Sequence, residues 1–278
     1  MQRRDFLALS GATMAVTGMG LPRFSVGGIS RIGIQLYSVR DLFGADPERT
    51  LAALAAIGYQ EVETAGYAKA TPAEMKAMLG RTGLVAPSAH VDLDALTTNL
   101  AATLDATHTV GHQYLMLAWI GAEQRKSLDT YRKVADVLNR AASEAKAAGI
   151  QIGYHNHDFE FAPLEGKTGY EALLESADHS LVKFELDLYW ATKAGADPLK
   201  LFAAWPERFP AVHVKDMGPN QSMVDVGDGT IDFARIFTHA RQAGIRHYFV
   251  EHDEPKDAML FARKSHDHLA KLTFEEAP

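Results

Sequence analysis

The sequence predicts one closed, parallel (β/α)8 barrel in a single domain. From about residue 30 onward, short runs rich in β-branched residues alternate with longer stretches of Ala/Leu periodicity. Several helical stretches are followed by glycine where a left-handed C-cap residue is wanted, namely Gly58, Gly83, Gly149 and Gly244. No linker and no low-complexity segment divides the sequence. Eight strand–helix alternations in one domain are typical of a closed parallel barrel.

The individual elements follow from the periodicity of apolar residues. The predicted strands span residues 32–37, 61–64, 85–90, 114–119, 151–155, 182–187, 211–215 and 248–251. The predicted helices span residues 47–57, 72–81, 93–107, 127–148, 199–205, 231–243 and 257–272. The stretch 127–148 shows the helical pattern well, because Leu128, Tyr131 and Val134 recur on one side.

A doubly wound open sheet is the alternative architecture. It would place a Gly-x-Gly-x-x-Gly turn after the first strand, and the loop at residues 38–45 carries no such motif. We therefore expect residues 30–278 to form one barrel domain.

Composition and charge limit the classes of partner and ligand. The 278-residue chain is 47% hydrophobic and 23% charged, as in ordinary soluble globular proteins. Its formal net charge of -7 disfavours nucleic acids and anionic membranes as partners, because both favour a basic surface. The sequence has no cysteine, so any bound metal must have oxygen and nitrogen ligands.

The first 29 residues predict an export signal of the twin-arginine type. Arg3 and Arg4 precede an Asp-Phe-Leu sequence, and an apolar Gly/Ala-rich stretch at 8–21 ends before Pro22. This stretch is too weakly apolar for a membrane span, which needs about 20 strongly apolar residues. We therefore expect a periplasmic or otherwise exported protein that is free of the membrane after signal removal. An ordinary amphipathic helix is the alternative.

Acidic and imidazole side chains end several predicted strands. The strand ends read Ser88-Ala-His90, Tyr154-His-Asn-His157, Glu185-Leu-Asp187, His213-Val-Lys215 and Val250-Glu251. The carboxyl ends of barrel strands converge on one site, and several carboxylates buried together need a cation to offset their repulsion. We predict that Asp187, His213 and Glu251 bind one divalent metal ion. The alternatives are a helix cap for Asp187 and a core histidine for His213.

These motifs resemble those of the xylose-isomerase-like TIM-barrel superfamily. The matching series is Tyr-His-Asn-His-Asp-Phe-Glu-Phe (154–161), Leu-Asp-x-Tyr-Trp (186–190), His-Val-Lys-Asp (213–216), Val-Gly-x-Gly-x-Ile-Asp (226–232) and Val-Glu-His-Asp (250–253). The resemblance runs from about residue 32 to 272 with the motifs in the expected order. The superfamily includes ketose 3-epimerases, inosose dehydratase, hydroxypyruvate isomerase and the apurinic-site endonuclease.

The resemblance implies one divalent ion bound through a Glu, an Asp, a His and a second Glu. Asp187, His213 and Glu251 match the last three of these ligands. The position of the first glutamate falls near Tyr154, so we expect Glu160 to complete the set. His157, His155 or water is the alternative fourth ligand. Manganese is the expected ion, with magnesium, cobalt and zinc as alternatives.

The resemblance also implies a metal-dependent isomerase or epimerase of a sugar or keto-sugar, 3-keto-glycosides included. Such enzymes act through an enediolate intermediate. The expected catalytic residues are Glu251, His157, Glu160 and Lys215. The expected substrate-binding residues are His90, His155, Tyr154, Trp119 and Trp190. A homo-oligomer is a further implication of the resemblance.

Other functions stay open at this point. A lyase or dehydratase acting on a keto-sugar or inosose forms the same enediolate beside a leaving group. A non-catalytic periplasmic sugar-binding protein would keep the barrel and lack the first glutamate. A phosphodiesterase like the apurinic-site endonuclease is disfavoured by the acidic charge balance and by the export signal.

Overall fold

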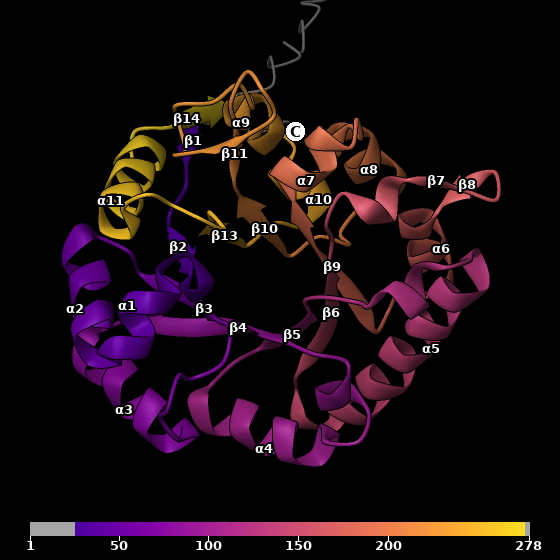
Figure 1. The fold of residues 1–278 in the computed structure, drawn as a ribbon, viewed down its shortest axis with the longest axis horizontal. Coiled ribbons are helices and arrows are strands. Elements are labelled where there is room, and N and C mark those ends of the chain that lie inside the picture. The colour runs from indigo at the N-terminus through magenta and orange to yellow at the C-terminus, as the bar shows by residue number, and fades with distance from the viewer. Residues whose placement is uncertain (1–25, 276–278) are drawn as a thin grey trace, which may run out of the picture.

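A computed structural model describes residues 26–275, and its central feature is a closed barrel of eight parallel strands (Figure 1). The strands are β2 (Gly33–Gln35), β3 (Glu61–Thr64), β4 (Val85–Val91), β5 (Tyr114–Leu117), β6 (Gln151–His155), β9 (Val182–Asp187), β10 (Ala211–Val214) and β13 (His247–Val250). Around the barrel they follow the chain order β2-β3-β4-β5-β6-β9-β10-β13, and β13 pairs with β2 to close it. The predicted (β/α)8 barrel is confirmed.

Helices form an outer ring around the strands (Figure 1). They are α1 (Arg40–Ala45), α2 (Pro47–Ile57), α3 (Pro72–Thr82), α4 (Leu100–Val110), α5 (Leu128–Ala145), α6 (Gly169–Ser176), α7 (Leu188–Lys193), α8 (Pro198–Ala204), α9 (Phe233–Phe237), α10 (Ala240–Ala243) and α11 (Ala258–Leu269). Gly149 and Gly244 end helical segments with φ of 71° and 85°, which is the left-handed conformation predicted for them.

Two predicted helices are shorter or divided in the structure. The stretch 93–107 contains a short 3-10 turn, η2 (Asp94–Leu96), before α4 begins, because Thr97 leaves the helical region at φ -122° and ψ -87°. The stretch 231–243 is divided into α9 and α10. Helix α6 is not predicted by periodicity, although a capping box of Thr168 and Glu171 marks its start.

The hydrophobic core lies between the barrel wall and the helices. On α5, the side chains of Leu128, Tyr131, Val134 and Leu138 are buried, and this is the face that the apolar pattern predicts. Inside the carboxyl end of the barrel the buried side chains are instead polar and charged, with Glu63 and His213 among them. The apolar core therefore holds the strands in register around a charged interior.

Near the described N-terminus, the chain pairs with its C-terminal segment. Strand β1 (Val26–Gly28) runs antiparallel to β14 (Thr273–Glu275), outside the barrel. The expected signal segment at 1–29 falls mostly on residues 1–25, which lie outside the described residues. Within residues 26–275, no helix combines the length and the apolar character that a membrane crossing requires.

Candidate active site

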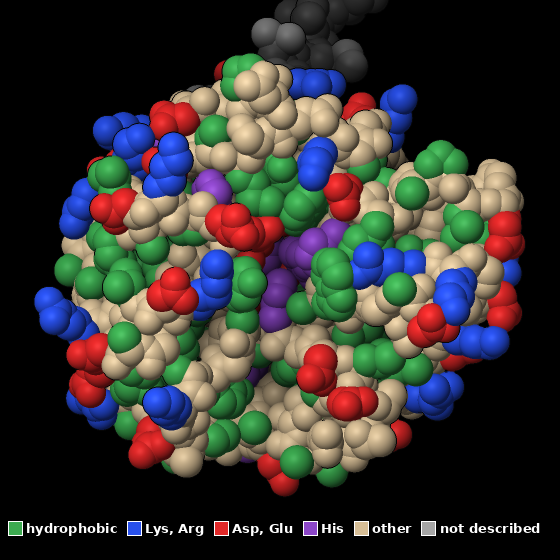
Figure 2. Space-filling view, in the orientation of Figure 1, with side chains coloured by type: hydrophobic (Ala, Val, Ile, Leu, Met, Phe, Trp, Pro, Cys, Tyr) green, Lys and Arg blue, Asp and Glu red, His purple; other side chains and the backbone are tan. Residues whose placement is uncertain are grey.

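A cleft of about 650 Å³ opens at the carboxyl ends of the barrel strands. Figure 2 shows histidine side chains gathered at a hollow near the middle of this face, with carboxylates beside them. Its lining includes the predicted residues His90, Trp119, His155, His157, Trp190, Lys215 and Glu251. Since parallel strands deliver their last side chains to one end of a barrel, residues far apart in sequence meet here.

Three predicted metal ligands lie together beside this cleft, and one of them, Glu251, lines it. Asp187, His213 and Glu251 form one group with His155, and one ligand atom of each lies within 4.8 Å of the others. His213 Nδ1 lies 2.7 Å from Glu251 Oε2 and 3.9 Å from Asp187 Oδ2. All four side chains are buried. The register explains the meeting of two of them, because His213 on β10 is paired with Asp187 on β9.

The donor set of this group fits a divalent metal ion. It offers two carboxylates and two imidazoles, which suit manganese, cobalt or zinc. Asp187 Oδ1 accepts a hydrogen bond from the backbone N–H of Trp190 at 2.8 Å and so caps α7. Asp187 Oδ2 has no hydrogen-bond partner within the described part of the chain. The cap and the ligand interpretations of Asp187 are therefore compatible, with one oxygen for each.

Lys215 supplies a cation beside the same carboxylates. Its buried Nζ lies 3.1 Å from Asp187 Oδ2, 2.8 Å from Glu251 Oε2 and 2.8 Å from Asp253 Oδ1. Burial opposes the charged amine, but the charges of Asp187, Glu251 and Asp253 outweigh that effect and raise the pKa of Lys215. The lysine is therefore an ammonium ion that neutralises part of the carboxylate charge.

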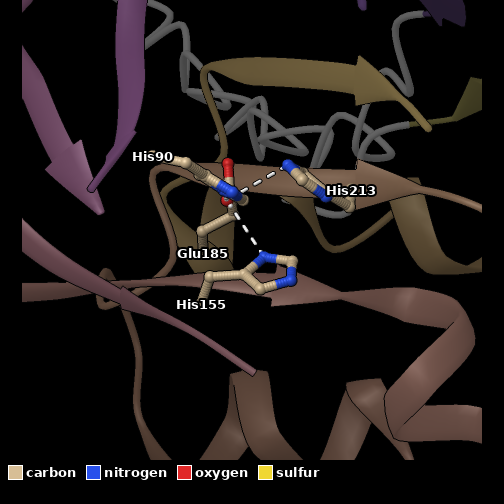
Figure 3. A group of neighbouring side chains, drawn as sticks. All are labelled: His90, His155, Glu185 and His213. Atoms are coloured by element: carbon tan, nitrogen blue, oxygen red, sulfur yellow. Dashed lines mark hydrogen bonds and ion pairs between the residues drawn. The ribbon is translucent and has the colours of Figure 1, made fainter. Parts of the chain in front are cut away.

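A second layer of charged groups lies deeper in the barrel, around Glu185. Figure 3 shows His90, His155 and His213 directed toward the Glu185 carboxylate. Glu185 Oε2 lies 2.8 Å from His90 Nε2, 3.1 Å from His155 Nδ1 and 3.1 Å from His213 Nε2. His213 thus has one ring nitrogen facing the candidate metal group and the other facing this inner layer.

Glu63 is the other carboxylate of the inner layer. Its Oε2 lies 2.6 Å from His213 Nε2 and accepts a hydrogen bond from Gln35 Nε2 at 2.7 Å. Its Oε1 accepts a hydrogen bond from the Ser88 hydroxyl at 2.5 Å. Glu63 is fully buried and is contacted by side chains from three other strands.

The ionisable groups of the inner layer differ in their affinity for protons. Burial raises the pKa of Glu63, and the neighbouring Glu185 charge raises it further. Burial also opposes charge on Glu185, but His213 and the other histidine contacts outweigh it and hold the pKa of Glu185 well below its usual range. The pKa of His213 is raised, since Glu185 and Glu251 outweigh the effect of its burial. His155, by contrast, is neutral, because burial and the charge of His213 lower its pKa to about 3.

Glu160, the expected fourth ligand, is not brought into the metal group. It lies in a 3-10 turn, η5 (Phe159–Phe161), that turns back against the barrel wall after β6. Its Oε1 accepts a hydrogen bond from the Tyr154 hydroxyl at 2.6 Å, and its Oε2 accepts one from the backbone N–H of His157 at 2.8 Å. Neither Glu160 nor Tyr154 is among the described residues that line the cleft. The fourth position near the other three ligands is held by His155 instead.

Two polar groups at the cleft wall have no partner among residues 26–275. They are His157 Nδ1 and the indole N–H of Trp190, and both atoms are buried. Burial, with the charge of Lys215 adding to it, lowers the pKa of His157 to about 2, so this imidazole is neutral. Trp119 lies edge-on to His157, with ring centroids 4.7 Å apart, and is 52% exposed.

Glu63 and Glu185 are functional candidates that the motif analysis does not select. Glu185 carries the same signal as the selected residues, an acidic side chain near the end of an apolar strand, whereas the strand of Glu63 reads Glu-Val-Glu-Thr and carries it less clearly. Glu185 lies two residues before Asp187, so the two side chains share the inner face of β9. A search for acidic side chains that alternate with apolar ones along the strands 61–64 and 182–187 would have identified both.

Comparison with known proteins identifies the family of the chain. The sequence profile of the Xylose isomerase-like TIM barrel family matches residues 51–272. The chain is similar to an inosose dehydratase of Geobacillus kaustophilus (strain HTA426), with 21% identity over 90% of this chain and 94% of that protein.

Solved structures show the same fold. A sugar phosphate isomerase/epimerase from Parabacteroides distasonis ATCC 8503 superposes with a TM-score of 0.78 at 26% identity, over 94% of this chain and 98% of that one. The IOLI protein, whose structure contains a zinc atom, shares the fold with a TM-score of 0.68 at 15% identity, over 87% and 99% of the two chains. The profile match covers most of the barrel, and the chain belongs to the xylose isomerase-like TIM barrel family.

Proposed function

We propose that this protein is a metal-dependent enzyme that isomerises or epimerises a sugar or keto-sugar through an enediolate intermediate. The observation that carries the proposal is the buried group of His155, Asp187, His213 and Glu251, whose ligand atoms lie within 4.8 Å of one another. At the adjoining cleft, His157 Nδ1 and Trp190 Nε1 are buried and lack hydrogen-bond partners in the described chain. A buried polar atom without a partner is costly, so a cation and a ligand rich in oxygen would complete this site.

His155, Asp187, His213 and Glu251 would hold the metal ion. When bound, the ion would polarise the carbonyl and the neighbouring hydroxyl of the substrate. Two imidazole nitrogens favour manganese, cobalt or zinc over magnesium. Among these we expect manganese or zinc, and the zinc atom in the related IOLI protein supports the second choice.

Glu251 would act as the base. Burial opposes charge on Glu251, but Lys215 and His213 outweigh it and hold the pKa of this carboxyl well below its usual range. The carboxylate is therefore ionised and able to take the proton α to the substrate carbonyl. The C–H bond would break, its electron pair would form the C=C bond of the enediolate while the carbonyl π pair moved onto its oxygen, and the proton would pass to Glu251.

Other side chains would bind and orient the substrate. The Lys215 ammonium and the indole N–H of Trp190 can donate hydrogen bonds to substrate oxygens, and neutral His157 can bind a hydroxyl. The His157 imidazole is neutral, so it is not a cationic acid, and Glu160 does not line the cleft. Glu251 is therefore the base best placed to return the proton. A site with one base is better suited to isomerisation, which moves a proton between adjacent carbons, than to an epimerisation that uses two bases.

A dehydratase is the second candidate, and the similarity to an inosose dehydratase favours it. The enediolate would form by the same step, next to a carbon that carries a hydroxyl group. The C–O bond would then break, and the proton held by Glu251 would leave with the hydroxide as water. A single base on one face of the substrate is sufficient for this sequence.

Proton exchange tests both candidates. Protein reloaded with manganese is incubated in deuterated water with a panel of ketoses, inososes and 3-keto-glycosides, and deuterium at the α-carbon is followed by NMR. We expect exchange into one class of substrate, and its loss in Glu251→Gln with retention in the control Glu175→Gln, at an exposed glutamate outside the described cleft lining. Absence of exchange on every sugar, together with no bound metal, would contradict enzymatic function and favour a binding protein.

We also propose export by the twin-arginine route, on the basis of Arg3 and Arg4. Cell fractionation of the full chain and of a variant with Arg3→Lys and Arg4→Lys tests this proposal. Periplasmic protein is expected from the first and cytoplasmic protein from the second. Equal distribution of the two would contradict it.

A further inference from the structure

The cleft is strongly acidic. Its described lining contains the carboxylates Asp92, Asp158, Glu251, Asp253 and Glu254. Lys215 is the only lysine or arginine in that described lining. A negatively charged substrate would therefore approach several like charges at one opening.

The positive charges near the cleft are already engaged. Lys215 contacts Asp187, Glu251 and Asp253 at 3.1, 2.8 and 2.8 Å. Outside the lining, Lys193 lies 3.2 Å from Asp158, and the Arg125 guanidinium donates to the backbone carbonyl of Ile120. Phosphate sites in proteins use free Arg or Lys side chains or helix N-termini, and a phosphorylated sugar would find no free side chain of this kind in the described lining.

Aromatic side chains stand at the mouth of the same cleft. Trp119 is 52% exposed and Tyr37 is 44% exposed, although both are large hydrophobic residues. Trp119 follows β5 and Tyr37 follows β2, and β3 and β4 separate these two strands around the barrel. Exposed aromatic rings that line a cleft mark a binding surface more often than isolated exposed residues do.

The Trp119 ring is held in place before any ligand binds. The Arg125 guanidinium stacks at 4.2 Å from its centroid, and Phe159 lies edge-on at 5.1 Å. His157, which we assign to substrate binding, lies edge-on at 4.7 Å. A ring fixed on three sides and half exposed offers a rigid platform at low entropic cost, adjacent to the reacting group.

The cleft is also larger than one sugar ring needs. Its volume of about 650 Å³ lies within the range of about 300–1,000 Å³ typical of sites for drug-sized ligands. The space between the floor at Glu251 and the mouth at Trp119 can therefore take a second ring.

We propose that the substrate is an uncharged glycoside, with its carbonyl-bearing ring over Asp187, His213 and Glu251 and its second ring packed against Trp119. This proposal rests on the proposed enediolate chemistry for the placement of the first ring. It makes phosphorylated sugars the weakest substrates, and it gives Trp119 the role of selecting the group attached to the sugar. The attached ring presents an apolar face, either the face of a second sugar or an aromatic aglycone.

Matched substrates test the proposal. Deuterium exchange is measured on a free keto-hexose, its 6-phosphate, and the methyl and phenyl glycosides of the same keto-sugar. We expect kcat/KM for the phenyl glycoside to exceed that of the free sugar by about tenfold or more, with the phosphate weakest. Trp119→Ala should raise KM for the phenyl glycoside by about tenfold at nearly unchanged kcat. Leu260→Ala, an exposed residue of α11 outside the described cleft lining, is the control.

The outcomes separate this proposal from the proposed function. Exchange that is as efficient with the free sugar or the phosphate overturns the glycoside proposal and leaves the enediolate chemistry intact. If no sugar exchanges, the proposed function fails, and calorimetric binding of phenyl glucoside, which carries no carbonyl, still decides the ligand class. Tighter binding by the wild type than by Trp119→Ala then supports an uncharged glycoside ligand, whereas equal binding or none overturns it.

Discussion

Glu63 fixes the imidazole of His213 from the side opposite the candidate metal. Its Oε2 lies 2.6 Å from His213 Nε2, while His213 Nδ1 faces Asp187 and Glu251. A carboxylate behind a metal-binding histidine sets its tautomer and its orientation, and its loss typically reduces metal affinity by about 10–100-fold. Glu63 is therefore a positioning residue for the candidate metal group.

We expect Glu63→Gln to weaken metal binding by about tenfold or more without unfolding the protein, because the amide cannot serve as a charged acceptor. The measurement is the dissociation constant for manganese from a competition titration. Glu61→Gln, on the same strand and paired with His247 instead, is the matched control. Equal affinities in both variants would contradict the positioning role.

Glu160 makes stability depend on pH. Burial raises the pKa of Glu160 to about 7 in the folded protein, from an ordinary value of 4.5. Between these two values the folded state binds more protons than the unfolded state, so the free energy of unfolding falls as pH rises from about 4.5 to 7. The contribution of this one group is on the order of 3 kcal/mol.

The Glu160→Gln variant should lack this contribution. Urea unfolding at several pH values is expected to show a less negative dependence of unfolding free energy on pH, between about 4.5 and 7, than in the wild type. Glu175→Gln, at an exposed ion pair with Lys167, should leave the wild-type dependence unchanged. Identical profiles for the wild type and Glu160→Gln would show that this carboxyl titrates normally.

Asp187, His213 and Glu251 were within reach of sequence reasoning, while the fourth member of their group, His155, was only one of the alternatives to Glu160. The two acids and the imidazole lie at or near the ends of apolar strands, which is a local signal. The choice between Glu160 and His155 depends on how the loop after β6 turns, and the bonds from Tyr154 and the His157 backbone draw Glu160 away. These contacts depend on the tertiary structure, and the spacing of residues in the sequence does not reveal them.

Among the elements, strand register carries most of the functional geometry. His213 is paired with Asp187, and His155 with Glu185, so adjacent strands deliver donors at the same level of the barrel. The strand prediction captures this arrangement because apolar runs ending in polar residues fix both the face and the end of each strand. Helix boundaries are harder, since the break at Thr97 between η2 and α4 involves no Gly or Pro.

Helix α5 anchors one side of the barrel through its buried face. Leu138 is fully buried there, and we expect Leu138→Ala to reduce the free energy of unfolding by about 2–5 kcal/mol. Denaturant unfolding at fixed pH measures the loss. Asp136→Ala, on the exposed face of the same helix, should change stability by less than about 0.5 kcal/mol. A similar small change for both would show that α5 packs loosely on the barrel.

At the scale of the whole molecule, an apolar barrel holds a compact set of charges at one end. Glu63, Glu185, Asp187 and Glu251 are all buried, and His213 and Lys215 lie between them. Such a set is expensive to bury for packing alone, and a divalent ion would offset part of the repulsion between carboxylates. The central claim is therefore that the chain binds one metal ion through Asp187, His213, Glu251 and His155.

Calorimetric titration with manganese and with zinc, supported by elemental analysis, tests this claim most directly. The wild type and Glu160→Gln are predicted to bind one ion per chain with similar affinity, while Asp187→Asn and His155→Ala lose at least tenfold. Circular dichroism of each variant confirms that the barrel is folded. No binding by the wild type, or loss of binding in Glu160→Gln with retention in Asp187→Asn, would contradict the account.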